Sequence, residues 1–423
     1  MMKIHRYRSE IALTLFFILS RIFYYQLGVR FDITGLAGFN QYVDVRILQD
    51  HLFQTVFYLN SKPPLFFLFL GTVLKWFPNH YPQVFNGVYL FCGWLLVMCL
   101  YRILRFLDIR NLFCFVSLMM FMIHPAVILY DNWCFYAYPH AVLLCLSVSF
   151  LIRFSVKKTF KDAVAFFIII SFLMLSRSVF HPLWFFCLMI FLLLHFKLHR
   201  RTILLAACIP MLIVFSVYLK NYILFGTQTF SPYLFGFQLS RMTVAQLPRE
   251  KLKQLVDEGR ISPFTALEVR DPRMFELYKP HFFNFPETGV KVLDQLYNSN
   301  GSLNMNNLGF VKLGKLFKKD SLYVFRHFPD TYLKSLGITY LLYFFPAPVE
   351  VYFKNRQIIH PIERVFQLMF IPFERSADIY SSRFNDPRSI TGLRWDGLSR
   401  LAFSMVVLLY LLSIANVFRL YVK

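Results

Sequence analysis

Long apolar stretches recur along the sequence, and short polar connections separate them. A transmembrane helix needs about 20 apolar residues to cross the roughly 30 Å hydrocarbon core of a bilayer. Seven such stretches come first, then a mixed region with many charges, and then two more stretches. The pattern therefore predicts an all-α polytopic membrane protein with about nine transmembrane helices. The predicted spans are residues 10–29, 84–104, 111–129, 139–154, 162–176, 180–196, 201–223, 333–352 and 399–421.

The order of these spans divides the chain into three predicted regions. Residues 1–226 form a seven-helix membrane module whose first outer loop is residues 30–83, residues 227–331 form an extracytoplasmic region, and residues 332–423 form a C-terminal membrane region. The span 333–352 is the least regular one, because two prolines interrupt it and a glutamate lies at its end.

One further apolar run, residues 65–77, is too short to cross a bilayer. We predict that this run lies in the outer interface or dips into it. With this assignment, the basic clusters at the ends of the spans fall on one side of the membrane, which is cytoplasmic by the positive-inside rule. These clusters contain His5, Arg6, Arg8, Arg102, Arg105, Arg110, Arg153, Lys157, Lys158, Lys161, Lys197, Arg200 and Arg201.

The composition supports a membrane protein, since 57% of the residues are hydrophobic and only 16% are charged. A water-soluble fold could not bury that much apolar surface in its core. The net charge of +22 also suits nucleic-acid binding, but the basic residues gather at cytoplasmic loop ends, where anionic lipid headgroups account for them. We therefore expect membrane lipid, and no nucleic acid, as a partner. The seven cysteines lie almost all inside predicted spans and are interpreted as apolar core residues.

The first outer loop places a carboxylate, Asp32, at the outer end of the first span, and Lys62 follows further along the same loop. A charge this close to the hydrocarbon is costly unless it has a partner or a function. In the structural interpretation, Asp32 forms an ion pair with Arg30 or Arg46 and only marks the end of the helix.

Two other outer loops add charged residues to the same membrane face. Asp131 lies among aromatic residues between the third and fourth spans, and Arg177 lies in the tight turn between the fifth and sixth. The alternative for Arg177 is that its guanidinium reaches lipid headgroups. Together with Lys62, these residues suit an anionic lipid-linked substrate, because cations bind phosphate and a carboxylate can take a proton from an acceptor hydroxyl.

These residues resemble motifs of the integral-membrane glycosyltransferases of the GT-C fold, especially the aminoarabinose transferases of lipid A and the protein O-mannosyltransferases. Phe31-Asp32 resembles the catalytic aspartate after the first helix, and Lys62-Pro63-Pro64-Leu65-Phe66 resembles the motif before the second. Asp131 matches the second outer-loop carboxylate, and Arg177 matches a phosphate-binding lysine. Ile33 follows Asp32, so the tandem Asp-Glu of the mannosyltransferases is absent. The resemblance covers roughly the first 225 residues.

The resemblance implies a glycosyltransferase that moves a sugar from a polyprenyl-phosphate-linked donor to an acceptor with inversion at the sugar. Asp32 acts as the base, with Asp131 as the second catalytic candidate, while Lys62 and Arg177 neutralise the departing phosphate. Lys220 is a third candidate cation. The other candidate substrate-binding residues are Tyr136, His181 and Asn306, although loop asparagines often cap turns instead.

No cofactor and no metal are expected, because the sequence has neither a Gly-rich phosphate loop nor a cluster of ligands with metal-binding spacing. Two other functions remain open: a transporter or flippase of a lipid-linked saccharide, and a non-catalytic membrane scaffold of the same fold. A transporter would typically show mid-span ionisable residues and an internal repeat. The motifs and the absence of paired outer cysteines favour a bacterial inner membrane over the endoplasmic reticulum.

Overall fold

A computed structural model describes residues 2–38, 42–267, 273–343, 353–369 and Leu408. These residues are helical apart from loops and two isolated β-bridges, so the predicted all-α class is confirmed for the part of the chain that is described. The chain divides into two compact units. Of the described residues, the first unit contains those within 2–232, Phe285–Val311 and Lys354–Ile359, and the second contains those within 233–284, 312–343 and 360–369 together with Phe353 and Leu408. Residues 285–311, which the sequence placed in a separate extracytoplasmic region, therefore belong to the first unit.

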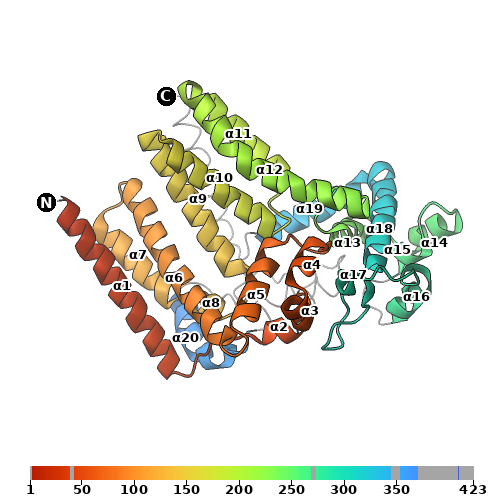
Figure 1. Cartoon of the computed structure of the whole chain (residues 1–423), viewed down its shortest axis with the longest axis horizontal. Helices are drawn as coiled ribbons and strands as arrows, with labels where there is room; N and C mark the ends of the chain where they lie inside the picture. The colour runs from red at the N-terminus through yellow and green to blue at the C-terminus, as the bar shows by residue number, and fades with distance from the viewer. Residues whose placement is uncertain (1, 39–41, 268–272, 344–352, 370–407, 409–423) are drawn as a thin grey trace. The chain divides into compact units, whose positions relative to one another are not determined.

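Long helices make up most of the first unit (Figure 1). They are α1 (Met2–Gln26), α6 (Tyr81–Phe106), α7 (Asn111–Ile123), α9 (Ala137–Lys157), α10 (Phe160–Ser176), α11 (Pro182–His195) and α12 (Arg200–Phe225). Shorter helices are α2 (Thr34–Gly38), α3 (Val45–Asp50), α4 (Leu52–Phe57), α5 (Leu65–Trp76), α8 (Pro125–Asp131), η1 (Lys197–His199) and α17 (Lys291–Asp294).

The helices of the first unit pack in two connected groups. In one group α1, α6 and α7 lie side by side around a buried core that includes Leu13, Val97 and Leu118. In the other group α10 lies against α5, α9 and α12, and its buried side chains include Phe167 and Leu173. Contacts between α6 and α9 join the two groups. Each helix therefore buries one apolar face against its neighbours.

Among the described residues, three helices are long and apolar enough to cross a membrane: α6, α9, and the stretch Lys197–Phe225 formed by η1 and α12. The pair α7 and α8 forms a fourth candidate, but it bends by 61°. The bend lies at His124, whose Nδ1 accepts from the backbone N–H of Ala126 and starts a new helix. The sequence predicted a span over 111–129, and the structure divides these residues into two helices at this bend.

Several predicted membrane elements have clear counterparts in the described residues. The helix α5 has 12 residues and is too short for a span, as expected for the run 65–77. The predicted span 333–352 corresponds to α19 (Pro329–Tyr343) as far as residue 343, and its remainder lies outside the described residues. The predicted span 399–421 also lies outside them, apart from Leu408. The structure supports a helical membrane protein, and the number of nine spans stays a prediction.

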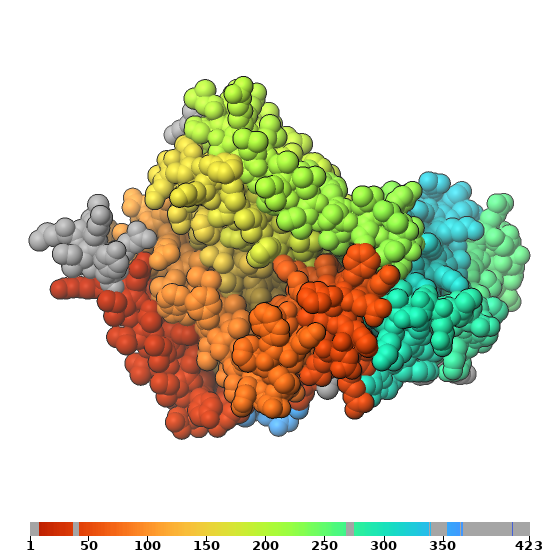
Figure 2. Space-filling model, in the orientation of Figure 1, coloured from red at the N-terminus to blue at the C-terminus, as the bar shows by residue number. Residues whose placement is uncertain are grey.

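The outward faces of α1, α11 and α12 are strongly apolar. In Figure 2, α11 and α12 project as a ridge beyond the neighbouring helices of the unit. Large apolar side chains on these three helices are exposed, among them Leu15, Leu19, Ile190, Leu194, Leu205, Ile209 and Leu212. Soluble proteins rarely expose continuous apolar faces of this size. Contact with lipid hydrocarbon accounts for them.

The second unit is made of shorter helices. They are α13 (Pro232–Met242), η2 (Val244–Gln246), α14 (Arg249–Asp257), α15 (Pro263–Ala266), α16 (Arg273–Phe282), most of α18 (Leu308–His327), α19, and most of α20 (Arg356–Met369). Leu247, Leu255 and Val324 are part of its apolar core. The carboxylate of Asp320 accepts hydrogen bonds from the backbone of Ser262 and the hydroxyl of Thr265.

The close approach of α13 and α18 requires glycine at Gly236. A Cβ atom at this position would lie 2.2 Å from the carbonyl oxygen of Gly314, and backbone atoms cannot rotate away. We expect Gly236→Ala to lower the free energy of unfolding by about 1–3 kcal/mol or more, measured by thermal unfolding of the full chain in detergent. Gly337→Ala is the matched control, because nothing lies within 4 Å of that position. Equal stability of the two variants would contradict this packing.

Candidate functional site

The backbone around Asp32 is fixed by the loop that follows α8. The N–H of Asp32 donates to the carbonyl oxygen of Asn132 at 2.8 Å, and the N–H of Cys134 donates to the carbonyl oxygen of Asp32 at 3.0 Å. Arg30, two residues before Asp32, is held by Asn355, whose side-chain amide bonds both the N–H and the carbonyl oxygen of Arg30. The segment after α1 is therefore anchored on two sides.

The carboxylate of Asp32 is buried, with 7% of the residue exposed. Its Oδ1 accepts from the N–H of Thr34 at 2.9 Å and from the hydroxyl of Thr34 at 2.6 Å. Its Oδ2 is buried and has no hydrogen-bond partner among the described residues. The ion pair with Arg30 or Arg46 is absent from the described part of the chain, since the Arg30 guanidinium instead stacks on Tyr25 at 3.7 Å. One oxygen of Asp32 is thus held in place while the other remains without a partner.

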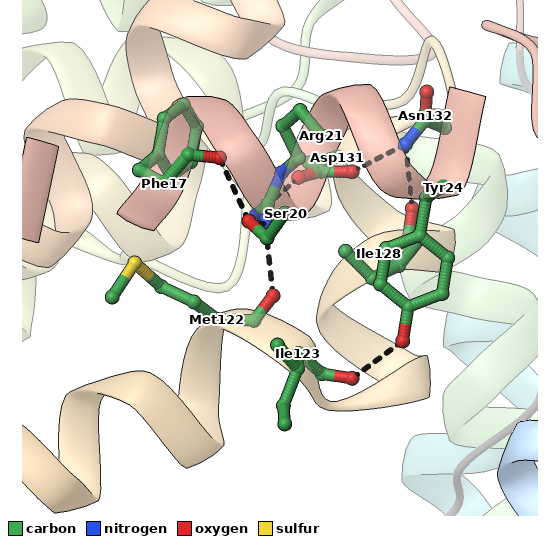
Figure 3. A network of polar contacts seen from close by, with 9 residues as sticks. All are labelled: Phe17, Ser20, Arg21, Tyr24, Met122, Ile123, Ile128, Asp131 and Asn132. Atoms are coloured by element: carbon green, nitrogen blue, oxygen red, sulfur yellow. Dashed lines mark hydrogen bonds and ion pairs between the residues drawn. The ribbon is translucent and has the colours of Figure 1, made fainter. Parts of the chain in front are cut away.

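Asp131 has a different environment, which Figure 3 shows. It is fully buried, and its Oδ2 lies 2.6 Å from a guanidinium nitrogen of Arg21 on α1. Its Oδ1 accepts from the side-chain amide of Asn132 at 2.6 Å. Arg21 also donates to the carbonyl oxygen of Met122 at 2.8 Å. Because both carboxylate oxygens are engaged, the geometry supports a structural ion pair between α1 and α8, and it gives no support to Asp131 as a catalytic residue.

Arg177 contacts Tyr136, and its charge also acts on Lys62. Arg177 follows the last residue of α10, and its guanidinium carbon lies 5.0 Å from the centre of the Tyr136 ring. The same ring contacts Phe66 edge-on at 5.8 Å, at the start of α5. Burial and, to a lesser extent, the charge of Arg177 lower the pKa of Lys62 to about 8. The charges of Lys62 and Arg177 are therefore close enough to interact, and Arg177 lies over the Tyr136 ring.

Two other predicted substrate-binding residues hold the loop that precedes Lys62. The ammonium group of Lys220 donates to the carbonyl oxygens of Phe57 at 2.6 Å and Leu59 at 3.1 Å. The Oδ1 of Asn306 accepts from the hydroxyl of Ser61 at 2.8 Å and from its N–H at 3.1 Å. These contacts assign Lys220 and Asn306 to positioning the loop, which agrees with the alternative interpretation of the asparagine.

His181 starts α11 and does not face the cations through any contact of the described residues. Its Nδ1 accepts from the N–H of Leu183 at 3.2 Å, and the residue is exposed. Its ring lies 6.4 Å from that of Tyr218. The geometry therefore gives His181 the role of a helix cap.

Sequence reasoning missed three residues that shape the site. Arg21 lies inside an apolar helix, where a charge signals a buried partner. Thr34 lies two residues after Asp32, a spacing that favours a local turn with the carboxylate. His140 on α9 is buried close to Tyr136 and had no distinguishing sequence signal besides its place after Pro139.

The part of the chain that the structure describes contains no group of three or more His, Cys, Asp and Glu residues placed to hold a metal ion. Comparison with protein-family models, with curated proteins and with solved structures found no match to this chain. The likeness to the GT-C glycosyltransferases therefore rests on the motifs and residues described above.

The buried ion pair generates a prediction about stability. Arg21→Met leaves the Asp131 carboxylate buried without a counter-charge, so we expect a loss of about 3–5 kcal/mol in the free energy of unfolding. The double variant Arg21→Met with Asp131→Leu removes both charges and should recover most of that loss. Thermal unfolding in detergent measures both effects.

The pair Arg102–Glu10 serves as the control, because its atoms are 3.4 Å apart and 53% of the Arg102 side chain is exposed. Arg102→Met should change the free energy of unfolding by about 1 kcal/mol or less. A double variant no more stable than Arg21→Met alone would show that the two charges are not coupled.

Proposed function

We propose that the protein is an integral-membrane glycosyltransferase that moves a sugar from a polyprenyl-phosphate-linked donor to an acceptor at the outer membrane face. The supporting observation is that Asp32, with one buried oxygen lacking a partner, and Arg177 both contact the short segment from Trp133 to Tyr136. A base and a phosphate-binding cation on one segment suit a single substrate. Lys62 supplies a second cation beside Arg177.

In this proposal Asp32 acts as the general base. Thr34 holds Oδ1, so Oδ2 is directed to accept the proton of the acceptor hydroxyl. The acceptor oxygen forms a bond to the anomeric carbon of the sugar as the bond from that carbon to the phosphate oxygen breaks. The electron pair of the broken bond leaves with the polyprenyl phosphate. Asp32 ends the step protonated and then releases its proton to water.

Lys62 and Arg177 have the electrostatic role. The leaving polyprenyl phosphate gains negative charge as the sugar departs, and nearby cations stabilise that charge more strongly in the transition state than in the bound donor. Two like charges close together also disfavour each other, and this repulsion contributes to the lowered pKa of Lys62. A bound phosphate relieves the repulsion, so the ligand-free site is held in a state that favours anion binding.

Replacing Asp32 distinguishes an effect on the rate of sugar transfer from an effect on donor binding. We expect Asp32→Asn to lower the rate of sugar transfer by about 10²- to 10⁴-fold, because the amide keeps the size of the side chain but cannot take the proton. Donor affinity should stay near that of the wild type, and the two quantities are measured separately on protein that elutes as a folded species. Asp50→Asn, an exposed carboxylate on the same outer loop, is the control and should keep its rate.

An unchanged transfer rate in Asp32→Asn would remove Asp32 as the base. The wild-type assay also tests the enzyme class, because transfer releases polyprenyl phosphate whereas a flippase leaves the bond between sugar and phosphate intact. Binding of the donor without release of polyprenyl phosphate would therefore favour the transporter or the scaffold.

The lowered pKa of Lys62 predicts a pH dependence of donor affinity. Since this pKa is about 8 in the ligand-free protein, the affinity for polyprenyl phosphate should fall as the pH rises through that value and the ammonium loses its proton. The stability of the ligand-free protein has the opposite dependence. The pKa lies below its usual value of 10.5, so the unfolded chain binds the proton more strongly, and stability rises between about 8 and 10.5.

The variant Lys62→Met tests both the effect on donor affinity and the opposite effect on stability. At neutral pH it should raise the midpoint of thermal unfolding of the ligand-free protein and weaken the binding of polyprenyl phosphate. It should also flatten the pH dependence of binding. Lys75→Met, an exposed lysine at the end of α5, is the control and should change neither quantity. A Lys62→Met protein with wild-type affinity would exclude Lys62 from the phosphate site.

A further inference from the structure

His140 is a buried polar side chain that the proposed reaction does not yet use. It lies in the first turn of α9, and only 4% of the residue is exposed. The backbone of Tyr136, one turn earlier, is the polar group that acts on the His140 ring, but neither ring nitrogen forms a hydrogen bond of normal geometry within the described residues. A buried donor or acceptor without a partner carries its full desolvation cost. Such a residue needs an explanation other than packing.

The rings around His140 do not by themselves require histidine. The Tyr136 ring lies 5.3 Å away at 70°, and the Phe180 ring lies 6.0 Å away at 40°. A phenylalanine would make the same ring contacts without burying two nitrogen atoms. The packing therefore accounts for an aromatic ring at this position, whereas it gives neither imidazole nitrogen a well-formed hydrogen bond.

The charged neighbours of His140 indicate what its nitrogens meet. Arg177 acts electrostatically on both His140 and Lys62, and its guanidinium lies over the Tyr136 ring at 5.0 Å. Arg177 and His140 thus both lie against the Tyr136 ring, and Lys62 is close enough to Arg177 for the two charges to interact. Two of these groups are cationic donors, and a neutral imidazole supplies one further N–H donor. Such a set of donors suits the oxygens of a phosphate group.

We propose that His140 binds the substrate by donating a hydrogen bond from its imidazole to a phosphate oxygen, completing an anion site with Lys62 and Arg177. This inference rests on the proposed function, because the ligand is the phosphate of the lipid-linked donor. Hydrogen bonds to an ionised acceptor are stronger than those between neutral groups. The cations supply charge, while the N–H of His140 fixes the orientation of the phosphate relative to Tyr136.

The experiment measures binding of farnesyl phosphate to the full chain in detergent, with farnesol as the uncharged counterpart. His140→Phe keeps the ring contacts and removes both nitrogens, so it should weaken farnesyl phosphate binding by about 10- to 100-fold. Farnesol binding should not change. The ligand-free His140→Phe protein should be at least as stable as the wild type, because two buried nitrogens that lack a well-formed hydrogen bond have been removed. Lower affinity at undiminished stability separates a binding role from a structural one.

Two amide variants identify the donating nitrogen. His140→Asn places an N–H near the position of Nδ1, and His140→Gln places one near Nε2. One of them should recover most of the affinity for farnesyl phosphate. His195→Phe, at the opposite end of α11 from His181, is the control and should keep wild-type affinity.

The outcomes distinguish this inference from the proposed function. If Lys62→Met and Arg177→Met weaken farnesyl phosphate binding but His140→Phe does not, the role of His140 is wrong and the proposed function stands. If His140→Phe weakens binding of farnesyl phosphate and farnesol equally, the residue shapes the apolar part of the site and the inference is also wrong. If the wild type binds farnesol but not farnesyl phosphate, both the anion site and the proposed function are wrong.

Discussion

The first unit depends on the buried ion pair between Arg21 on α1 and Asp131 on α8. Neither charge is tolerable alone among apolar helices, so the two helices must meet where the charges meet. This requirement sets the position of α1 along α8. The residues directly after Asp131 then form the backbone bridge to Asp32. The placement of the candidate base therefore follows from an electrostatic requirement inside the helix bundle.

A second constraint acts on the loop that carries Lys62. The loop before Lys62 has no regular structure of its own, and its carbonyl and N–H groups are satisfied by Lys220 and Asn306. Support of this kind holds the backbone before Lys62, so that this segment resists moving away from the charge of Arg177. The ligand-free protein thereby gives up some stability at the place where an anion would restore it.

The sequence predicted the helices well, because a membrane span is a local property of apolar composition and length. The predicted span 84–104 corresponds to α6 at Tyr81–Phe106, and 201–223 corresponds to α12 at Arg200–Phe225. The partners of individual charges could not be predicted, since Arg21 and Asp131 lie far apart in the chain. Lys220 and Asn306 were recognised as polar residues in suitable places, but the carbonyl and N–H groups that they bind appear only in the fold. The bend at His124 had a local signal in Pro125, and the apolar pattern outweighed it.

Residues late in the chain, within Phe285–Val311 and Lys354–Ile359, belong to the first unit, and this has a consequence for biogenesis. Asn306 holds the loop before Lys62, and Asn355 holds the backbone of Arg30, although the helices that carry the site end by residue 225. Synthesis runs from the N-terminus, so the membrane helices are made well before the residues that brace the loops between them. Insertion into the bilayer and maturation of the site are therefore separate events in the life of the chain. A nascent protein released too early would have its membrane helices and yet lack the residues that brace these loops.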